Sequence, residues 1–191
     1  MEEGFLYTQR LMQKMTELAQ GKFTYTPTRV ISPEVISDIY NSAPIYFGLM
    51  GKVISSDEGS LLDSRLPLPI DPEKKVYLLI SQNGASVALL SCIVDYPTTD
   101  VVFLGWLIVH GQHLFQGIGR SNYQIFCEAV SSIGMKQINI LIEAQNQAAI
   151  TFWEGLGFKQ TPVSIQRASV YSGVGIEYYF DLQGKDEITN P

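Results

Sequence analysis

The chain has 191 residues, of which 46% are hydrophobic and 17% are charged, and its formal net charge is −6. This length and apolar content suit one globular domain with a sizeable core. The acidic balance, with no cluster of Lys or Arg, argues against nucleic acid as a partner, because clustered cations are what bind phosphate backbones. We therefore expect a single folded domain that does not bind nucleic acid.

Targeting signals and disulfides are not expected. Residues 1–5 lack the basic start of a signal peptide, and the longest apolar run, 101–109, is too short to cross a bilayer. The sequence thus predicts a cytoplasmic protein that does not enter a membrane. Cys92 falls on an expected strand and Cys127 on the apolar side of an expected helix, where small buried thiols are common, so we expect both to be free.

The first third of the chain is expected to be mainly helical. Apolar residues at helical spacing predict a helix within residues 1–22, interpreted as an N-terminal extension. A strand is expected over 23–31. A serine followed by a proline then starts a helix, since a capping residue and a first-turn proline are typical of a helix start. Short helical segments are expected over 44–51 and 57–65.

The main sheet is expected next. Asn83-Gly84 between two apolar runs is a strong hairpin signal and predicts antiparallel strands over 76–81 and 86–94. The expected elements that follow are a strand over 101–109, a helix from 118 that Gly134 ends, a strand over 137–142, a helix from 147, strands over 158–167 and 175–182, and a disordered tail over 183–191. The strand–helix–strand crossover implies some parallel pairing in an otherwise antiparallel sheet.

Two sequence patterns point to a ligand. Strand 101–109 leads into the loop 115–120, Phe-Gln-Gly-Ile-Gly-Arg, where the glycines let backbone approach a ligand and the next helix presents unpaired N–H groups to phosphates. Alone, Gly117-x-Gly119 is more often an ordinary strand-to-helix turn. A second pattern, Asn146-x-x-Ala149-x-x-Phe152-Trp153-x-x-x-Gly157-Phe158, follows downstream. The two patterns together favour a cofactor that carries phosphate.

Together these patterns resemble the GNAT superfamily of acetyl-CoA-dependent N-acyltransferases, over roughly residues 23–182. The family's first motif, Gln/Arg-x-x-Gly-x-Gly/Ala, matches at Gly117 and Gly119, whereas its leading position falls on Leu114. The resemblance implies one α+β, three-layer domain over 23–182, with a mixed, mostly antiparallel sheet of about seven strands and helices on both faces. It implies an N-acetyltransferase that transfers the acetyl group of acetyl-CoA directly to a primary amine of a small molecule or peptide. Dimers are frequent in the family, and the N-terminal helix has an apolar face.

The resemblance also assigns the cofactor site. In the family, the pyrophosphate lies on backbone N–H groups of the loop. Pantetheine pairs like an extra strand with the end of the strand before the loop, where that strand separates from the following strand. The residues implied to bind the cofactor are Leu107, Ile108, Val109, Phe115, Gln116, Gly117, Ile118, Gly119, Arg120, Asn146 and Trp153.

The acid that would protonate the leaving thiolate stays open. Many relatives carry a tyrosine acid where this chain has Trp153, and an indole N–H is not acidic enough for that role. We expect Trp153 to pack beside the cofactor or in the core. Water, Ser121, Tyr171 and Tyr178 are unranked alternatives for the acid.

The base that would deprotonate the amine also stays open, because strand 101–109 has no carboxylate where relatives often carry a glutamate. Asp95 at the end of the hairpin strand is the first candidate, although a turn-capping role before Pro97 explains it equally well. His110 and His113 flank the loop and belong to the residue type that most readily exchanges protons near neutral pH. His110 is therefore the second candidate. No pattern completes a metal site.

Aromatic residues are the candidates for binding the acceptor. Tyr46 and Phe47 lie on the segment that usually covers the acceptor cleft in the family, and Tyr96 follows the hairpin strand. Trp106, on strand 101–109, faces either this cleft or a helix. Aromatic residues at helical spacing are more often core than pocket, so the sequence leaves both roles open.

Two other functions compete with this one. A dinucleotide-binding unit would explain the Gly-x-Gly turn and Glu143, but its third glycine position falls on Asn122 and the loop follows a hairpin strand in mid-chain. A catalytically weak or inactive acyl-CoA sensor or interaction module of the same fold is suggested by Leu114, by Trp153 and by the missing strand glutamate. Such a module would bind acetyl-CoA without releasing CoA to any amine.

Overall fold

The computed structural model describes residues 6–43, 55, 70–161, 167–168 and 174–183. In these ranges, eight strands form one sheet in the order β1-β2-β3-β4-β5-β8-β6, with β7 also paired to β8. The strands are β1 Thr24–Pro27, β2 Lys75–Gln82, β3 Ala85–Val94, β4 Val101–Val109, β5 Gln137–Glu143, β6 Lys159–Gln160, β7 Arg167–Ala168 and β8 Val174–Asp181. The α-helices are α1 Leu6–Ala19, α2 Pro33–Ser42, α5 Ile118–Ser132 and α6 Gln147–Glu154.

The sheet is mixed and mostly antiparallel, as predicted: β4 and β5 pair in parallel, and the other described pairs are antiparallel. The predicted hairpin joins β2 to β3, and its turn residues Asn83 and Gly84 both have positive φ, at 52° and 79°. Two-residue hairpins favour this geometry because it matches the twist of the strands. A three-residue 3-10 turn, Thr28–Val30, replaces the end of the strand expected over 23–31. Pro27 has no N–H to continue the ladder.

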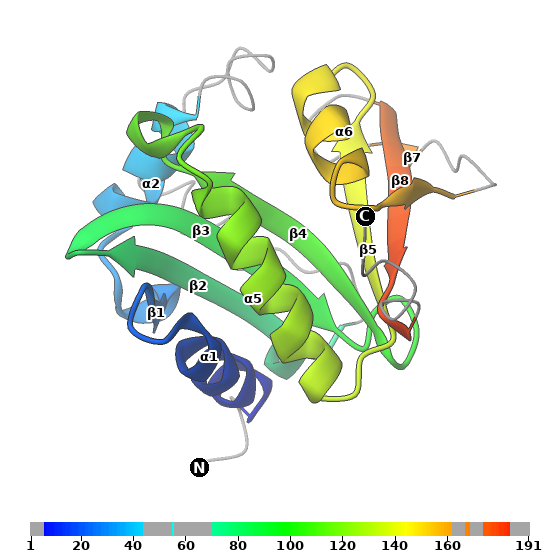
Figure 1. The fold of residues 1–191 in the computed structure, drawn as a ribbon, viewed down its shortest axis with the longest axis horizontal. Coiled ribbons are helices and arrows are strands. Elements are labelled where there is room, and N and C mark those ends of the chain that lie inside the picture. Colours follow the sequence, from blue (N-terminus) through cyan, green and yellow to red (C-terminus); the bar gives the residue numbers. More distant parts are fainter. Residues whose placement is uncertain (1–5, 44–54, 56–69, 162–166, 169–173, 184–191) are drawn as a thin grey trace, which may run out of the picture.

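Helices cover both faces of the sheet (Figure 1). The side chains of α1, α5 and α6 share one hydrophobic core with alternate residues of the strands, while α2 packs with a smaller core on the opposite face. Leu11 and Met15 of α1 are completely buried. Burying a side chain of this size contributes about 1.5–3 kcal/mol. The predicted N-terminal helix thus shares the main core.

The strands β4 and β5 separate along their length. Their parallel pairing runs only from Val101 to Phe103, opposite Gln137–Asn139. The register between β3 and β4 shifts at Gly105, because Ser91 pairs with Trp106 whereas Cys92 pairs with Leu104. Beyond this bulge the β5-facing edge of β4 has no strand partner among the described residues.

Some expectations concern residues outside the described ranges. These are the helical segments over 44–51 and 57–65, the acceptor candidates Tyr46 and Phe47, the acid candidate Tyr171, most of the tail over 183–191 and the middle of the strand expected over 158–167. The described ends of that last strand are β6 and β7. Cys92 and Cys127 are both buried as free thiols, and burial raises the pKa of Cys92 to about 12. Within the described ranges, no helix is long and apolar enough to cross a membrane.

Candidate active site

A cavity of about 390 Å³ opens where β4 ends and α5 and α6 begin. All but one of the predicted cofactor residues line it: Leu107, Ile108, Val109, Phe115, Gly117, Ile118, Gly119, Arg120, Asn146 and Trp153. The exception is Gln116, whose side-chain amide donates to the carbonyl oxygen of Gln112 at 3.0 Å. Six further lining residues were not predicted to bind the cofactor: Ala43, His113, Leu114, Ala148, Ala149 and Phe152. Phe152 and Ala149 belong to the second sequence pattern, which was the available signal.

The loop before α5 leaves the start of this helix open. Gly117 is the N-cap, in the left-handed conformation with φ 77°, and it has no side chain to cap the first-turn N–H groups. These groups and the helix dipole make the end of α5 a suitable anion site. A Cβ atom added to Gly119 would lie 3.4 Å from Val109 and 3.6 Å from Phe152, at ordinary van der Waals contact. Phe115, at φ 61°, is 98% exposed on the cavity rim.

The side chain of Asn146 begins α6. It is 4% exposed, and its Oδ1 accepts a hydrogen bond from the N–H of Ala149 at 3.0 Å. This N-cap interaction fixes the first turn of α6 against the cavity.

Trp153 lies between the cofactor cavity and the space where β4 and β5 separate. It lines both the large cavity and a smaller one, of about 90 Å³, between Gly105–Ile108 and Ile140–Ile142. Its ring packs edge-to-face against the rings of Tyr123 and Phe158, with ring centroids 5.4 Å and 5.2 Å apart. The indole therefore packs both against the core and beside the cavity.

His110 fastens the end of β4 to α2. Its Nδ1 accepts the N–H of Gln112 at 3.2 Å, and its Nε2 lies 3.2 Å from Oδ2 of Asp38. This network assigns the ring proton to Nε2, with Asp38 as its acceptor. With both nitrogens engaged, His110 holds this corner of the site and lacks a free nitrogen for an acceptor amine. His113 lines the cavity itself.

The neighbouring Gly111 completes the attachment to α2. Its N–H donates to Oγ of Ser42 at 2.9 Å, and an added Cβ would lie only 2.0 Å from the Ser42 carbonyl oxygen. Only glycine allows this close approach of the two backbones.

Asp95 lies away from the cofactor cavity, at the opposite end of β4. The eight steps from Val101 to Val109, at about 3.3 Å each, put roughly 26 Å between the ends of β4. Its Oδ2 accepts the hydroxyl of Tyr7 at 2.9 Å, and its Oδ1 accepts the N–H of Asp100 at 3.0 Å. The structure thus supports the turn-capping role and separates Asp95 from the predicted cofactor residues. Tyr96 shares this end and packs edge-to-face on Phe103.

The described acid candidates are engaged elsewhere. The hydroxyl of Tyr178 donates to Oε1 of Glu154 at 3.3 Å, and burial, with Glu154 adding to it, raises the pKa of Tyr178. Oγ of Ser121 accepts a hydrogen bond from Nζ of Lys22 at 3.2 Å. Both hydroxyls thus have hydrogen-bond partners within the chain, and the acid stays unassigned.

Trp106 faces the side of the sheet that carries α2. It packs edge-to-face on Tyr40 at 5.9 Å and also lines the space between β4 and β5. It pairs across the sheet with Ser91, whose Oγ is buried and has no hydrogen-bond partner in the described part of the chain. Trp106 therefore packs against a helix, α2, and also borders the space between β4 and β5.

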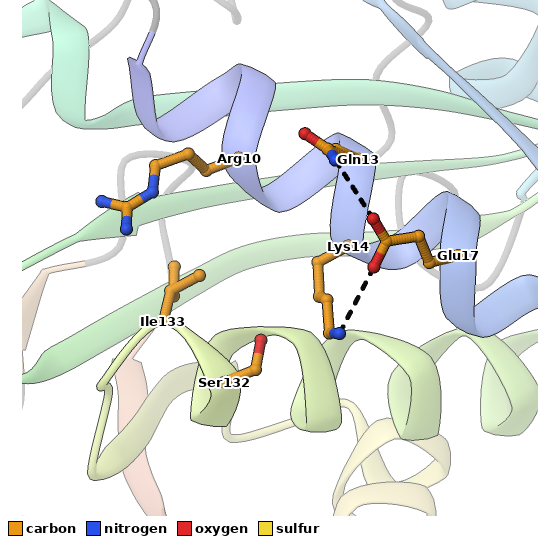
Figure 2. Close-up of a pocket in the computed structure, with 6 residues that line it drawn as sticks. All are labelled: Arg10, Gln13, Lys14, Glu17, Ser132 and Ile133. Carbon is orange, nitrogen blue, oxygen red and sulfur yellow. Dashed lines mark hydrogen bonds and ion pairs between the residues drawn. The ribbon is translucent and has the colours of Figure 1, made fainter.

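A second hollow, of about 240 Å³, lies between α1 and the C-terminal end of α5. In Figure 2, Gln13 and Lys14 both point to Glu17, whose two oxygens they bind at 3.1 and 3.3 Å, whereas Arg10 points away. The carboxylate is thus neutralised locally, and the C-terminal end of a helix disfavours anions. Among the described residues, no group of three His, Cys, Asp or Glu side chains could hold a metal ion.

Comparisons with known proteins agree with this geometry. The profile of the Acetyltransferase (GNAT) family matches residues 38–158. An acetyltransferase from Thermus thermophilus is 18% identical with a TM-score of 0.66, over 84% of this chain and 97% of that one. The ribosomal-protein-S18-alanine N-acetyltransferase from Escherichia coli is 17% identical with a TM-score of 0.61, over 84% and 94%. A spermidine N-acetyltransferase from Vibrio cholerae, solved with CoA and spermine, is 13% identical with a TM-score of 0.65, over 85% and 96%. Among curated proteins, no sequence matches the chain.

Proposed function

Since this chain belongs to the GNAT family of acetyltransferases, we propose that it transfers the acetyl group of acetyl-CoA directly to a primary amine of a small molecule or peptide. One observation carries the proposal: the cavity at the end of β4 gathers the Gly117–Gly119 loop, Asn146 and Trp153 around one space. These groups come from three separate segments of the chain, and an ordinary strand-to-helix turn would not need all three.

The residues present fit acetyl-CoA in two places. The uncapped N-terminus of α5 offers N–H groups to the pyrophosphate, and the β5-facing edge of β4 at Leu107–Val109 can pair with the pantetheine amides. When bound, the cofactor supplies an acetyl group activated as a thioester. A backbone N–H near Ile108 or Val109 would polarise its carbonyl oxygen as charge develops there.

A second function has some support from the site. No carboxylate lies on β4, and the indole N–H of Trp153 is not acidic enough to protonate a thiolate. An inactive module that only binds acyl-CoA would need neither a base nor an acid at these positions. The two functions share the cofactor cavity and differ in turnover alone.

The nature of the amine is suggested only broadly by the relatives. One structural neighbour is named for ribosomal-protein-S18 alanine and another for spermidine, so proteins of this fold act on different amines. Neither likeness exceeds 25% identity, and neither selects the acceptor.

Calorimetry with acetyl-CoA and a thiol-release assay over a panel of amines test the proposal together. We expect acetyl-CoA to bind and free CoA to appear with at least one amine. Arg120→Glu, which puts a negative charge on the exposed cavity rim, should weaken acetyl-CoA binding about tenfold. Arg10→Glu makes the same charge change at the hollow in Figure 2 and should leave binding unchanged.

The outcomes separate the alternatives. Binding without CoA release for any amine would favour the inactive module. No binding of acetyl-CoA would contradict both functions. Equal weakening by both arginine variants would mean a general effect of charge and not a cofactor site at the end of β4.

A further inference from the structure

We infer that the acceptor is an aliphatic amine that arrives as a positively charged ammonium ion, bound by Glu143 of β5 and Glu177 of β8, with Glu177 removing its proton. This inference rests on the proposed function and names the chemical class of its acceptor. Sequence patterns gave no sign of Glu177, because it becomes relevant only through the pairing of β5 with β8.

Both carboxylates lie on the face of the sheet opposite α5 and α6. In β5, Ile138, Ile140 and Ile142 enter the main core, so strand alternation puts Glu143 on the other face. In β8, Tyr178 enters that core, which puts Glu177 on the same face as Glu143. Trp106 and Ile108 of β4 belong to the core of this second face, across the separation of the strands.

The two carboxylates are close neighbours in the sheet. Glu177 pairs with Leu141 and Gly175 pairs with Glu143, so the carboxylates are diagonal neighbours. Such residues have Cα atoms roughly 7–8 Å apart, within reach of a single ammonium group or of two amines on one short chain.

Glu177 is held at the level of the strand separation. Leu141, its partner, lines the small cavity together with Gly105 of the β4 bulge. Oε1 of Glu177 accepts a hydrogen bond from Nδ2 of Asn139 at 3.3 Å, and Oδ1 of Asn139 accepts one from Nε2 of Gln137 at 2.6 Å. Asn139 is 6% exposed and pairs with Phe103 at the last rung before β4 and β5 part. Asn139 is thus a positioning residue for Glu177.

The buried carboxylate of Glu143 indicates that this site binds a cation. It is only 9% exposed, and its Oε2 is buried without a hydrogen-bond partner among the residues that the structure describes. A buried carboxylate oxygen without a partner costs free energy unless a cation or donor approaches it. Ser91, beside the β4 bulge and on this same face, has a second buried oxygen that no described residue hydrogen-bonds.

Other charged groups on this face are few among the described residues. Asp181 continues the β8 row beyond Tyr179, and its Oδ1 accepts the N–H of Gln183. Lys159 of β6 pairs with Tyr179 and is exposed. Arg167 of β7 pairs with Gly175, two residues before Glu177 in β8. Among the described ion pairs, none joins either glutamate to Lys159.

The chemistry balances without a further reactant. The ammonium loses one proton to the Glu177 carboxylate, and the freed nitrogen lone pair attacks the thioester carbonyl carbon. The C–S bond breaks, the nitrogen loses its second proton to the thiolate directly or through water, and Glu177 returns its proton to solvent. The products are an amide, CoA as a thiol and one proton.

The test uses the full chain with 1,4-diaminobutane as a charged aliphatic amine and aniline as an amine that is neutral at neutral pH. We expect acetylation of the diamine and at least tenfold lower kcat/KM for aniline. Glu177→Gln should lower kcat for the diamine about 100-fold, and its remaining activity should rise with pH as free amine forms. Glu143→Gln should raise KM for the diamine about tenfold and leave KM for aniline unchanged.

Asp181→Asn is the matched control, because it removes a carboxylate from the same strand and face farther from the strand separation. It should change both constants less than twofold. Acetyl-CoA affinity and circular dichroism show that each variant is folded, and Glu177→Asp replaces Glu177→Gln if that variant is not. A kcat for the diamine in Glu177→Gln within threefold of that of the unmodified protein would overturn the inference. A higher kcat/KM for aniline than for the diamine would also overturn it.

A binding arm separates this inference from the proposed function. Calorimetry with 1,4-diaminobutane and CoA measures the carboxylate site whether or not turnover occurs. No CoA release with any amine would contradict the proposed function. Diamine binding that Glu143→Gln weakens about tenfold would then still support the site, whereas no diamine binding to the unmodified protein would overturn it.

Discussion

The polar groups at the two ends of β4 have different partners. At the Val101 end, Asp95 accepts hydrogen bonds from Tyr7 of α1 and from the N–H of Asp100, so its carboxylate is satisfied within the chain. At the Val109 end, the helix that follows has an uncapped N-terminus beside a cavity of about 390 Å³. A turn can thus bind a ligand only where its polar groups are not already hydrogen-bonded within the chain.

The difference arises from the neighbours of β4. At the Val101 end, β4 pairs with β3 on one side and with β5 on the other, so both edges are occupied. Toward Val109, β5 departs and the open edge meets α5 and α6. The following changes test whether the Val109 end is the functional end, in order of decreasing expected effect.

Gly111→Ala should have the largest effect, because its Cβ would clash with the Ser42 carbonyl oxygen. We expect a loss of about 3 kcal/mol in the free energy of unfolding, which lowers the Tm by roughly 6–12 °C for a chain of this size. Gly21→Ala is the control. At φ 80° it has no atom within 4 Å of an added Cβ, so it should cost only about 1 kcal/mol. Equal costs for the two variants would contradict the close approach.

Asp95→Ala should lower the free energy of unfolding by about 2 kcal/mol, measured by urea denaturation. The variant leaves the Tyr7 hydroxyl and the Asp100 N–H without their acceptor and places alanine at φ 51°. Acetyl-CoA affinity and kcat should change less than twofold under conditions where the variant is folded. A tenfold loss of kcat in the folded variant would restore Asp95 as the base.

Trp153→Tyr should raise kcat about tenfold, because a phenol beside the cavity can protonate a leaving thiolate and an indole cannot. Trp153→Phe keeps an aromatic ring without the hydroxyl and should not raise kcat. Steady-state thiol release measures both. A rise in both variants would mean that the smaller ring, and not the hydroxyl, changes the rate.

The smallest expected effect is a pH dependence at the Val101 end. The hydrogen bond to Asp95, and then burial, raise the pKa of Tyr7 above its ordinary value of about 10. The unfolded chain then releases this proton first, so its stabilisation is present below pH 10 and is lost as pH rises through the folded pKa. For a partly exposed group we expect less than about 1 kcal/mol. Tyr7→Phe should remove this component from urea unfolding measured across alkaline pH, and an unchanged profile would contradict it.

The elements predicted well are those with local signals. The bounds of β4 match the expected strand over 101–109, and Asn83-Gly84 identifies the hairpin because the turn chemistry lies within the turn itself. All but one of the predicted cofactor residues line one cavity, and they could be listed because the loop and Asn146 each precede a helix whose start can be predicted from sequence.

The contacts that the sequence did not predict involve partners far apart in the chain. Asp95 is tied to Tyr7, 88 positions away, and His110 to Asp38, 72 positions away, so neither pairing can be inferred from local spacing. Glu177 gains its place through the register of β5 with β8. Such registers follow from tertiary packing and not from the pattern of one strand.

Backbone NMR during titration with acetyl-CoA tests the central claim most directly. We expect the amide signals of residues 107–109 and 115–120 to shift, while those of residues 95–100 at the other end of β4 stay unchanged. Shifts confined to residues 95–100, or no binding at all, would contradict a cofactor site at the Val109 end.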